Sequence, residues 1–403
     1  MSMIKHSAQG NKMILRLLTM ISVVTVTGFA VRAMTRHINK KFWQKTIIDQ
    51  AARALPFALL LSALMWGVGT MQNWSLMRLA GASSSALLLL IVVALLISLP
   101  LALLLALFTK KITTTLPRAE TADPARRRII TGAAAILPLT ATSAMGAGFG
   151  ASFSRTRIPQ IPMALPGLPD ALDGYKILHL SDLHLGYYFG LDHLEQTLLD
   201  AEPFQPDMVV VTGDIADDLS LMTDAMKLIG QLATPGPKYA SIGNHEYFRG
   251  IKESIRRIDA GPVPLLLNSY DQFMVGNTPV IIGGANDPVS LRADIHGFLD
   301  NSLTRTFNNA PDGPFRLLMS HRPKALDVAG KHKVGLVLSG HTHAGQVGLG
   351  GRSAWEIFTE NSYLWGAYQK GNTRLYTSAG MGHWFPFRLG APLEAPLITL
   401  RKG

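Results

Sequence analysis

The chain has 403 residues, of which 48% are hydrophobic and only 16% are charged, a composition that excludes a disordered protein and indicates membrane segments. The formal charge of +11 is divided unevenly, because residues 1–154 carry +13 and residues 155–403 carry −2. The basic residues are therefore expected to flank membrane segments, and no nucleic-acid partner is expected. Cysteine is absent, which excludes disulfides, zinc–thiolate sites and cysteine nucleophiles.

The N-terminal third contains long apolar stretches. Three stretches contain no charged residue: residues 54–77, 79–109 and 129–154. Each stretch is longer than the ~20 residues that a helix needs to cross a bilayer. A fourth stretch, Leu17–Val31, has 15 residues and reaches only ~22 Å as a helix. We predict that residues 1–154 form an anchor of three or four transmembrane helices. Because the long spans lack ionisable residues, an anchor is favoured over a transporter or channel.

The loops between these stretches predict the orientation in the membrane. Loops 32–53 and 110–128 each hold six Lys or Arg residues, and basic loops remain in the cytoplasm. The sequence therefore predicts a multi-pass protein of the cell (inner) membrane with residues 155–403 on the extracytoplasmic side.

Residues 155–172 contain four prolines and are predicted to form a Pro-rich linker. Residues 173–403 alternate short apolar runs with helical patterns, which indicates a layered α/β domain. Seven runs predict buried strands: Tyr175–Ser181, Asp207–Thr212, Tyr239–Ile242, Val280–Gly283, Phe315–Ser320, Val334–Ser339 and Arg374–Ser378. Four segments predict helices: Leu191–Ala201, Leu219–Leu232, Ile251–Ile258 and Pro323–Val328.

Five short motifs of Asp, Asn and His follow predicted strands, at the ends where α/β sheets collect ligands and catalytic groups. A single His after a strand is usually structural, whereas five such sites indicate a metal centre. The motifs are Asp182-Leu-His184, Gly213-Asp214 with Asp217, Gly243-Asn244-His245-Glu246, His321, and Gly340-His341-Thr-His343.

The residue types favour a dinuclear metal site. Such a site needs a carboxylate between two cations ~3.5–4 Å apart, with imidazole, amide and carboxylate ligands around them. Ligation by nitrogen and oxygen without thiolate suits Mn, Fe or Zn. In Asp-x-His and His-x-His, side chains two positions apart lie on one side of an extended backbone.

In this order, the motifs resemble the calcineurin-like metallophosphoesterase family over about residues 172–403. Finer features, including Asp173-Gly174-Tyr175 and Arg388-Leu-Gly-Ala-Pro392, resemble its membrane-associated bacterial branch. Ala344 replaces a glycine that is usual after His-x-His, and Leu393 precedes Glu394 where proline is common. The resemblance implies two sheets flanked by helices, two divalent metal ions and hydrolysis of a phosphoric ester.

The resemblance also implies roles for individual residues. Asp214 would bridge the two metals, His245 would donate a hydrogen bond or proton near the leaving oxygen, and Asp217 would orient His245. A metal-bound hydroxide would attack phosphorus in line. The implied ligands are Asp182, His184, Asp214 and His343 for one metal, and Asp214, Asn244, His321 and His341 for the other.

These features predict a membrane-anchored phosphoesterase that acts on a phosphoester or pyrophosphate, with a phospholipid or lipid-linked phosphate as the favoured substrate. Two alternatives stay open. The protein could be a protein or nucleotide phosphatase, or a catalytically silent sensor module on the same fold. The silent module would predict lost ligands, and every implied ligand is present.

Overall fold

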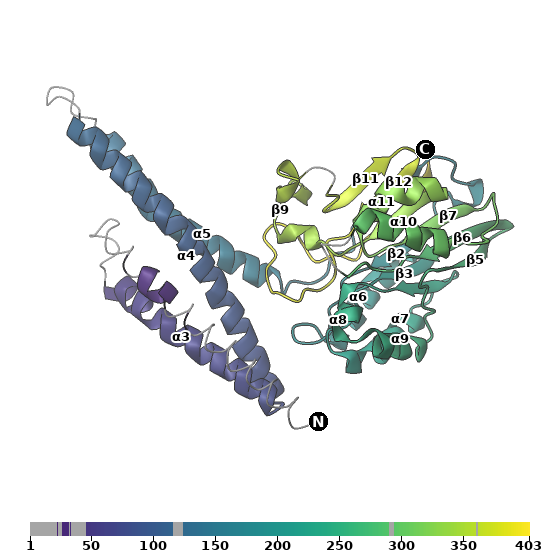
Figure 1. Cartoon of the computed structure of the whole chain (residues 1–403), viewed down its shortest axis with the longest axis horizontal. Helices are drawn as coiled ribbons and strands as arrows, with labels where there is room; N and C mark the ends of the chain where they lie inside the picture. The colour runs from purple at the N-terminus through teal and green to yellow at the C-terminus, as the bar shows by residue number, and fades with distance from the viewer. Residues whose placement is uncertain are drawn as a thin grey trace. The chain divides into compact units, whose positions relative to one another are not determined.

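A computed structural model describes residues 46–115, 124–289, 294–359 and 362–403, together with positions 22, 26–31 and 33. The chain divides into two compact units, Met1–Phe149 and Gly150–Gly403, which are called the N-terminal and C-terminal units below (Figure 1).

Three long helices lie in the described part of the N-terminal unit: α3 (Thr46–Met71), α4 (Ser75–Thr115) and α5 (Pro124–Ala151), which continues two residues into the C-terminal unit. Helices α3 and α4 form a hairpin through a short turn, and a Cβ atom at Gly69 or Gly81 would collide with the backbone of the opposite helix. Small residues at such contacts let apolar helices approach closely.

Two stretches within the described side chains, Asp49–Met71 and Ser75–Leu105, are long and apolar enough to cross a membrane. They correspond to the predicted spans 54–77 and 79–109. The predicted span 129–154 largely coincides with α5, part of whose side chains lies outside the described residues, and its insertion stays a prediction. Most of Leu17–Val31 also lies outside the described residues.

The C-terminal unit is built on two sheets (Figure 1). The first has the order β1-β13-β2-β3-β4, and the second has the order β11-β12-β8-β7-β6-β5. The strands of the first sheet are β1 (Gln160–Leu165), β13 (Leu397–Lys402), β2 (Lys176–Leu180), β3 (Met208–Thr212) and β4 (Lys238–Ser241). Those of the second are β11 (Gly366–Lys370), β12 (Thr373–Thr377), β8 (Val334–Ser339), β7 (Phe315–Met319), β6 (Thr278–Gly284) and β5 (Ser269–Val275).

Three apolar cores separate four layers. Alternate residues of β2 and β3 face opposite sides, because successive side chains of a strand point to opposite faces. Ile177 and Val210 pack against the second sheet, whereas Leu178 and Val209 pack under the helices of the first. A third core joins the outer face of the second sheet to its own helices. The helices are α6 (Leu191–Ala201), α7 (Met222–Gln231), α8 (Asn244–Arg249), α9 (Ile251–Asp259), α10 (Ile295–Thr306) and α11 (Leu326–Ala329). The prediction of two sheets flanked by helices is confirmed.

The structure differs from the prediction in the segment 155–172. Residues Gln160–Leu165 form strand β1, which pairs in parallel with β13 at the edge of the first sheet. Met163 and Leu165 are buried in the core between the sheets. This segment is therefore part of the folded unit. Its prolines are compatible with an edge strand, where one side of the backbone makes no ladder hydrogen bonds.

Candidate metal centre

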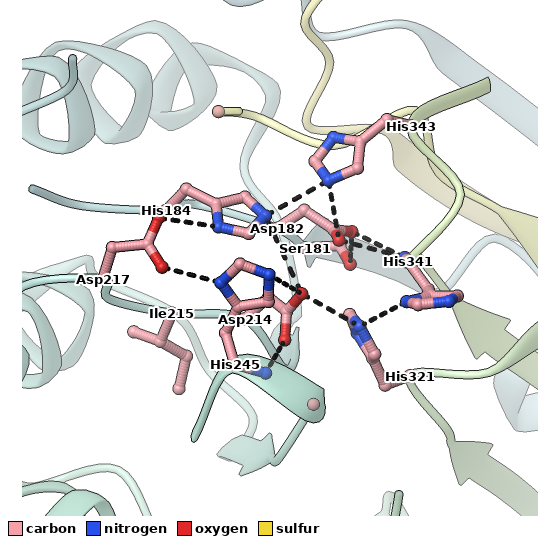
Figure 2. Close-up of polar contacts among 12 residues, drawn as sticks. Ser181, Asp182, His184, Asp214, Ile215, Asp217, His245, His321, His341 and His343 are labelled. Atoms are coloured by element: carbon pink, nitrogen blue, oxygen red, sulfur yellow. Dashed lines mark hydrogen bonds and ion pairs between the residues drawn. The ribbon is translucent and has the colours of Figure 1, made fainter. Parts of the chain in front are cut away.

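The two sheets bring all five motifs to one place. Asp182 follows β2, Asp214 follows β3 and Asn244 follows β4, and these three strands are parallel neighbours in the first sheet. His321 follows β7 and His341 follows β8, which are parallel neighbours in the second sheet. The carboxyl ends of both sets of strands therefore meet around one cluster of Asp and His side chains (Figure 2).

The backbone at these positions is in the left-handed region, which non-glycine residues rarely adopt. The φ angles are 51° at Asp182, 47° at His184, 51° at Asp214, 73° at His341 and 50° at His343. Such strain is typical of functional sites.

The residues next to these positions are also small, as the tight backbone of the site requires. A Cβ atom at Gly243 or Gly340 would collide with the carboxylates of Asp214 and Asp182, so glycine leaves room for these side chains. Ala344, which stands where the family usually has glycine, has a φ of 56°, a conformation that glycine adopts more readily.

One group of ligand atoms comprises Asp182, His184 and His343. The Nε2 atoms of His184 and His343 are 3.1 Å apart, and His343 Nε2 is 3.5 Å from Asp182 Oδ1. Two nitrogens bound to one cation at ~2.1 Å would be roughly 3.0–3.4 Å apart. The imidazoles therefore already have the separation of ligands that share a cation.

A second group comprises Asp214, His321 and His341. Asp214 Oδ2 is 3.2 Å from His321 Nε2, and His321 Nε2 is 3.2 Å from His341 Nδ1. The same Asp214 oxygen is 3.7 Å from His184 Nε2 in the first group. Asp214 thus lies between the groups, where a bridging carboxylate is required.

Asn244 provides an independent test of whether this set fits metal ions. Its side chain is 7% exposed, and its Oδ1 atom is buried without a hydrogen-bond partner. A buried carbonyl oxygen without a partner is costly, and a divalent cation is a partner for such an oxygen. The described residues therefore fit two divalent cations, held by nitrogen and oxygen ligands.

The charge distribution favours cations as well. Burial, with help from nearby positive groups, holds the pKa of His341 and of His343 well below the usual value, so both imidazoles are neutral, as ligands must be. Burial opposes ionisation of Asp214, but His321 and the other histidines hold its pKa well below the usual value. Asp214 in turn raises the pKa of His321 to about 10 against the effect of burial, because its carboxylate is 3.2 Å from the ring.

His245 lies beside the two groups and is held by Asp217 (Figure 2). Its Nδ1 donates to Asp217 Oδ1 over 2.7 Å, and its Nε2 is 4.0 Å from Asp214 Oδ2. Asp217 also accepts from His184 Nδ1 at 3.2 Å and from Arg249 Nη2 at 3.0 Å. Burial opposes the charge of Asp217, but His184 and His245 hold its pKa well below the usual value. Asp217 therefore orients one candidate ligand together with His245.

The geometry alone also allows another role for His245, because it forms a third group of possible ligands with His184 and Asp214. Its side chain is 13% exposed, whereas those of His184 and His321 are fully buried. This partial exposure, which His341 shares, allows His245 to contact a substrate.

Sequence reasoning assigned no role to Glu246, although it quoted this residue in a motif. Its carboxylate is fully buried and accepts hydrogen bonds from the backbone N–H groups of Asp214, Ile215 and Gly243, at 3.0, 2.8 and 2.7 Å. Glu246 thus joins the loops after β3 and β4. The signal in the sequence is its place at the third position of helix α8, where a glutamate can bond back to the residue before the helix.

Two buried arginines lie behind the His-x-His pair, and sequence reasoning did not find their contacts. Arg388 donates from Nη2 to His343 Nδ1 over 2.8 Å. Arg322 donates from Nη1 to His341 Nε2 over 2.6 Å and forms a bidentate ion pair with Asp287. Each contact is on the ring nitrogen that faces away from the ligand groups. The arginines therefore hold the two rings in place.

Comparison with known proteins matches this site to a family. Residues 175–345 match the family described as calcineurin-like phosphoesterase. An uncharacterized metallophosphoesterase of Helicobacter pylori is 31% identical over 266 residues, which are 63% of this chain and 66% of that protein. An uncharacterized metallophosphoesterase of Bacillus subtilis is 30% identical over 246 residues, 58% of this chain and 82% of that protein.

A third relative is described as a transmembrane protein with a metallophosphoesterase domain, from Danio rerio. It is 28% identical over 258 residues, which are 61% of this chain and 57% of that protein. The chain thus spans slightly less than two thirds of the Helicobacter relative and a little over half of the Danio relative.

Proposed function

The chain belongs to the calcineurin-like phosphoesterase family, and from this premise we propose that it is a membrane-anchored phosphoesterase that cleaves a phosphoester or pyrophosphate with two divalent cations. The observation that carries the proposal is the position of Asp214, which forms one ligand group with His321 and His341 and whose Oδ2 atom is 3.7 Å from His184 Nε2 of the other group.

We assign one cation to Asp182, His184, Asp214 and His343, and the other to Asp214, Asn244, His321 and His341. Bound divalent cations would supply Lewis acidity toward phosphoryl oxygens and lower the pKa of bound water. Manganese, iron and zinc all suit this ligand set.

The protein's own part in the reaction is proton transfer and positioning. His245 is a partly exposed histidine of the site, and its Nε2 atom is 4.0 Å from Asp214 Oδ2. Asp217 accepts from the opposite nitrogen, and the carboxylates of Asp217 and Asp214 raise the pKa of His245 against the effect of burial. The protonated ring can therefore present its Nε2–H group to the leaving oxygen. A positioned donor of this kind is the usual form of general acid catalysis.

The favoured substrate is a phospholipid or lipid-linked phosphate. Helix α5 ends at Ala151 and β1 begins at Gln160, so at most ~30 Å of extended chain joins them. If α5 spans the membrane as its sequence predicts, the metal centre stays near the headgroups. Similarity to a protein described as transmembrane supports an anchored arrangement. A protein or nucleotide phosphatase is the alternative, and a silent module is disfavoured because every ligand position is occupied by a competent residue.

The substrate class can be measured with the full chain in phospholipid nanodiscs supplied with Mn²⁺. We expect kcat/KM for a lipid phosphoester in the disc to exceed that for soluble aryl, nucleotide and phosphopeptide esters by at least about tenfold, because confinement to one surface raises the effective concentration. The Asp214→Asn variant, purified in parallel, corrects for contaminating phosphatases. A preference for nucleotides or phosphopeptides would favour the alternative, and no hydrolysis of any ester would overturn the phosphoesterase proposal.

The side of the membrane is a separate proposal. We place the C-terminal unit on the extracytoplasmic side, because the loops 32–53 and 110–128 hold most of the basic residues of the anchor. A reporter that is active only outside the cytoplasm should be active when it is fused after Gly403. A reporter that is active only inside the cytoplasm should be active when it is inserted near Lys41. A cytoplasmic signal from the C-terminal fusion would refute the orientation and would indicate a substrate made on the inner leaflet.

A further inference from the structure

The chain enters the C-terminal unit beside two loops that also contact the metal centre. Ser152 and Phe153 directly follow the last residue of α5. His383 Nε2 donates to the Ser152 carbonyl oxygen over 3.0 Å, and the Phe153 ring packs edge-on against His383, at 5.7 Å, and against Tyr188, at 6.0 Å. The entry segment is therefore fastened to two loops, 185–190 and 379–388.

These two loops also shape the metal centre. Loop 185–190 directly follows His184. In loop 379–388, the N–H of Gly382 donates to the Asp182 carbonyl oxygen over 2.8 Å, and Arg388 contacts His343. Trp384 is two residues beyond Gly382, so at most ~7 Å of backbone separates it from this contact with Asp182. The entry point and the metal centre thus share the same loops.

Large apolar side chains are exposed on these loops and on the adjoining hairpin. Phe153 is 41%, Tyr187 40% and Trp384 56% exposed. The hairpin of β9 (Gly348–Leu349) and β10 (Arg352–Ser353) follows the His-x-His segment and continues into a short 3-10 turn, Ala354–Ile357. We call six exposed residues the docking rim: Phe153, Tyr187, Leu349, Ile357, Phe358 and Trp384.

Hydrogen bonds connect the hairpin to loop 379–388. Gln346 donates to the Phe385 carbonyl oxygen over 3.4 Å, and the N–H of Gly348 donates to the Leu389 carbonyl oxygen over 2.8 Å. Figure 1 shows β9 and the loop before β13 at the same end of the C-terminal unit. The rim is therefore one region of the unit.

We propose that the docking rim inserts into the interface of the lipid bilayer and holds the metal centre close to the headgroups. Single exposed apolar residues are normal on soluble proteins, but a gathered patch indicates a partner. Trp, Tyr and Phe with neighbouring aliphatic residues are the side chains that bind the bilayer interface.

The bilayer is the favoured partner because of where the chain comes from. Phe153 is two residues from the end of α5, and two extended residues span only ~7 Å. If α5 spans the membrane, Phe153 is within reach of the headgroup layer. This argument rests on the anchored arrangement proposed above. A headgroup phosphate could then reach the two cations while its acyl chains remain in the bilayer.

The absence of cysteine from the chain makes the proposal testable without other changes. Trp384→Cys and Phe358→Cys would each be spin-labelled in the full chain, reconstituted into nanodiscs of phosphatidylcholine and phosphatidylglycerol. Met274→Cys is the matched control, because Met274 is a 56% exposed apolar residue on β5, which Figure 1 shows at the opposite end of the unit from β9. Accessibility to oxygen, which partitions into lipid, and to a nickel chelate, which does not, is measured by power saturation.

We expect both rim labels to be more accessible to oxygen than to nickel, and the Met274 label to show the reverse. Nickel accessibility at both rim positions equal to the control would overturn the proposal. Low accessibility to both reagents, with dipolar broadening between labels, would mean that a second copy covers the rim and would also overturn it. Should one rim variant fail to fold, judged by its bound metal, the other decides.

Hydrolysis of a lipid phosphoester in the same samples separates this inference from the proposed function. Immersed labels without hydrolysis would support the docking rim and contradict the proposed function. Hydrolysis with water-exposed labels would contradict the docking rim and support the proposed function.

Discussion

Replacing Asp214 with asparagine is expected to abolish turnover and to lower the bound metal. Asp214 is 2% exposed, and its Oδ2 atom is 3.7 Å from His184 Nε2 and 3.2 Å from His321 Nε2. An amide at this position cannot supply the negative charge that a carboxylate shared by two cations provides. We expect kcat to fall by more than about 10³-fold, which exceeds the loss from removing one oxyanion-hole donor, because both cations depend on this carboxylate.

The measurement combines steady-state kinetics with metal analysis of the purified full chain. His341→Ala, which removes a ligand of the second group, should show the same two losses. Asp218→Asn is the matched control, because Asp218 is an exposed neighbour whose carboxylate caps a turn by accepting from the N–H and the hydroxyl of Ser220, at 3.0 and 2.7 Å. If Asp214→Asn retained full activity, the assignment of a shared carboxylate would be wrong.

Replacing His245 with alanine is expected to lower kcat by about 10²–10⁴-fold, the usual contribution of a positioned general acid, while both metals stay bound. The reason is geometric. Asp217 fixes the Nδ1 side of the ring at 2.7 Å, and the Nε2 side is left to face the site.

A series of esters with leaving groups of different pKa distinguishes this role from a structural one. The defect should shrink as the leaving group becomes more acidic, because such a group departs without a proton donor. His296→Ala is the matched control, since the His296 side chain is 55% exposed and lies 3.7 Å from Asp327. Loss of metal from His245→Ala would instead make His245 a ligand of the group that it forms with His184 and Asp214.

The sequence alone predicted the central strands and the residues that follow them. Seven predicted strands correspond to β2, β3, β4, β6, β7, β8 and β12, and the predicted helix Leu191–Ala201 is α6. Most residues of these strands are buried on both faces, so most of the strands are apolar runs in the sequence. A polar Asp, Asn or His directly after such a run is a local signal, and the structure brings all five of these signals together.

Three of the strands that were not predicted share a physical reason. β1, β5 and β11 are sheet edges with several exposed residues each, so they lack a continuous apolar run. β1 lies in a segment whose prolines favour a linker when read locally. Only its pairing with β13, more than 200 residues away, makes it a strand.

The supporting contacts of the metal centre depended on the tertiary structure in the same way. Arg388 meets His343 across 45 residues of sequence, and Glu246 meets Asp214 across 32. The identity of a ligand follows from the chemistry of its own side chain, which the sequence displays. The group that holds a ligand in place follows from how strands stack and which loops then face each other. Those are properties of long-range packing, and no local pattern in the sequence encodes them.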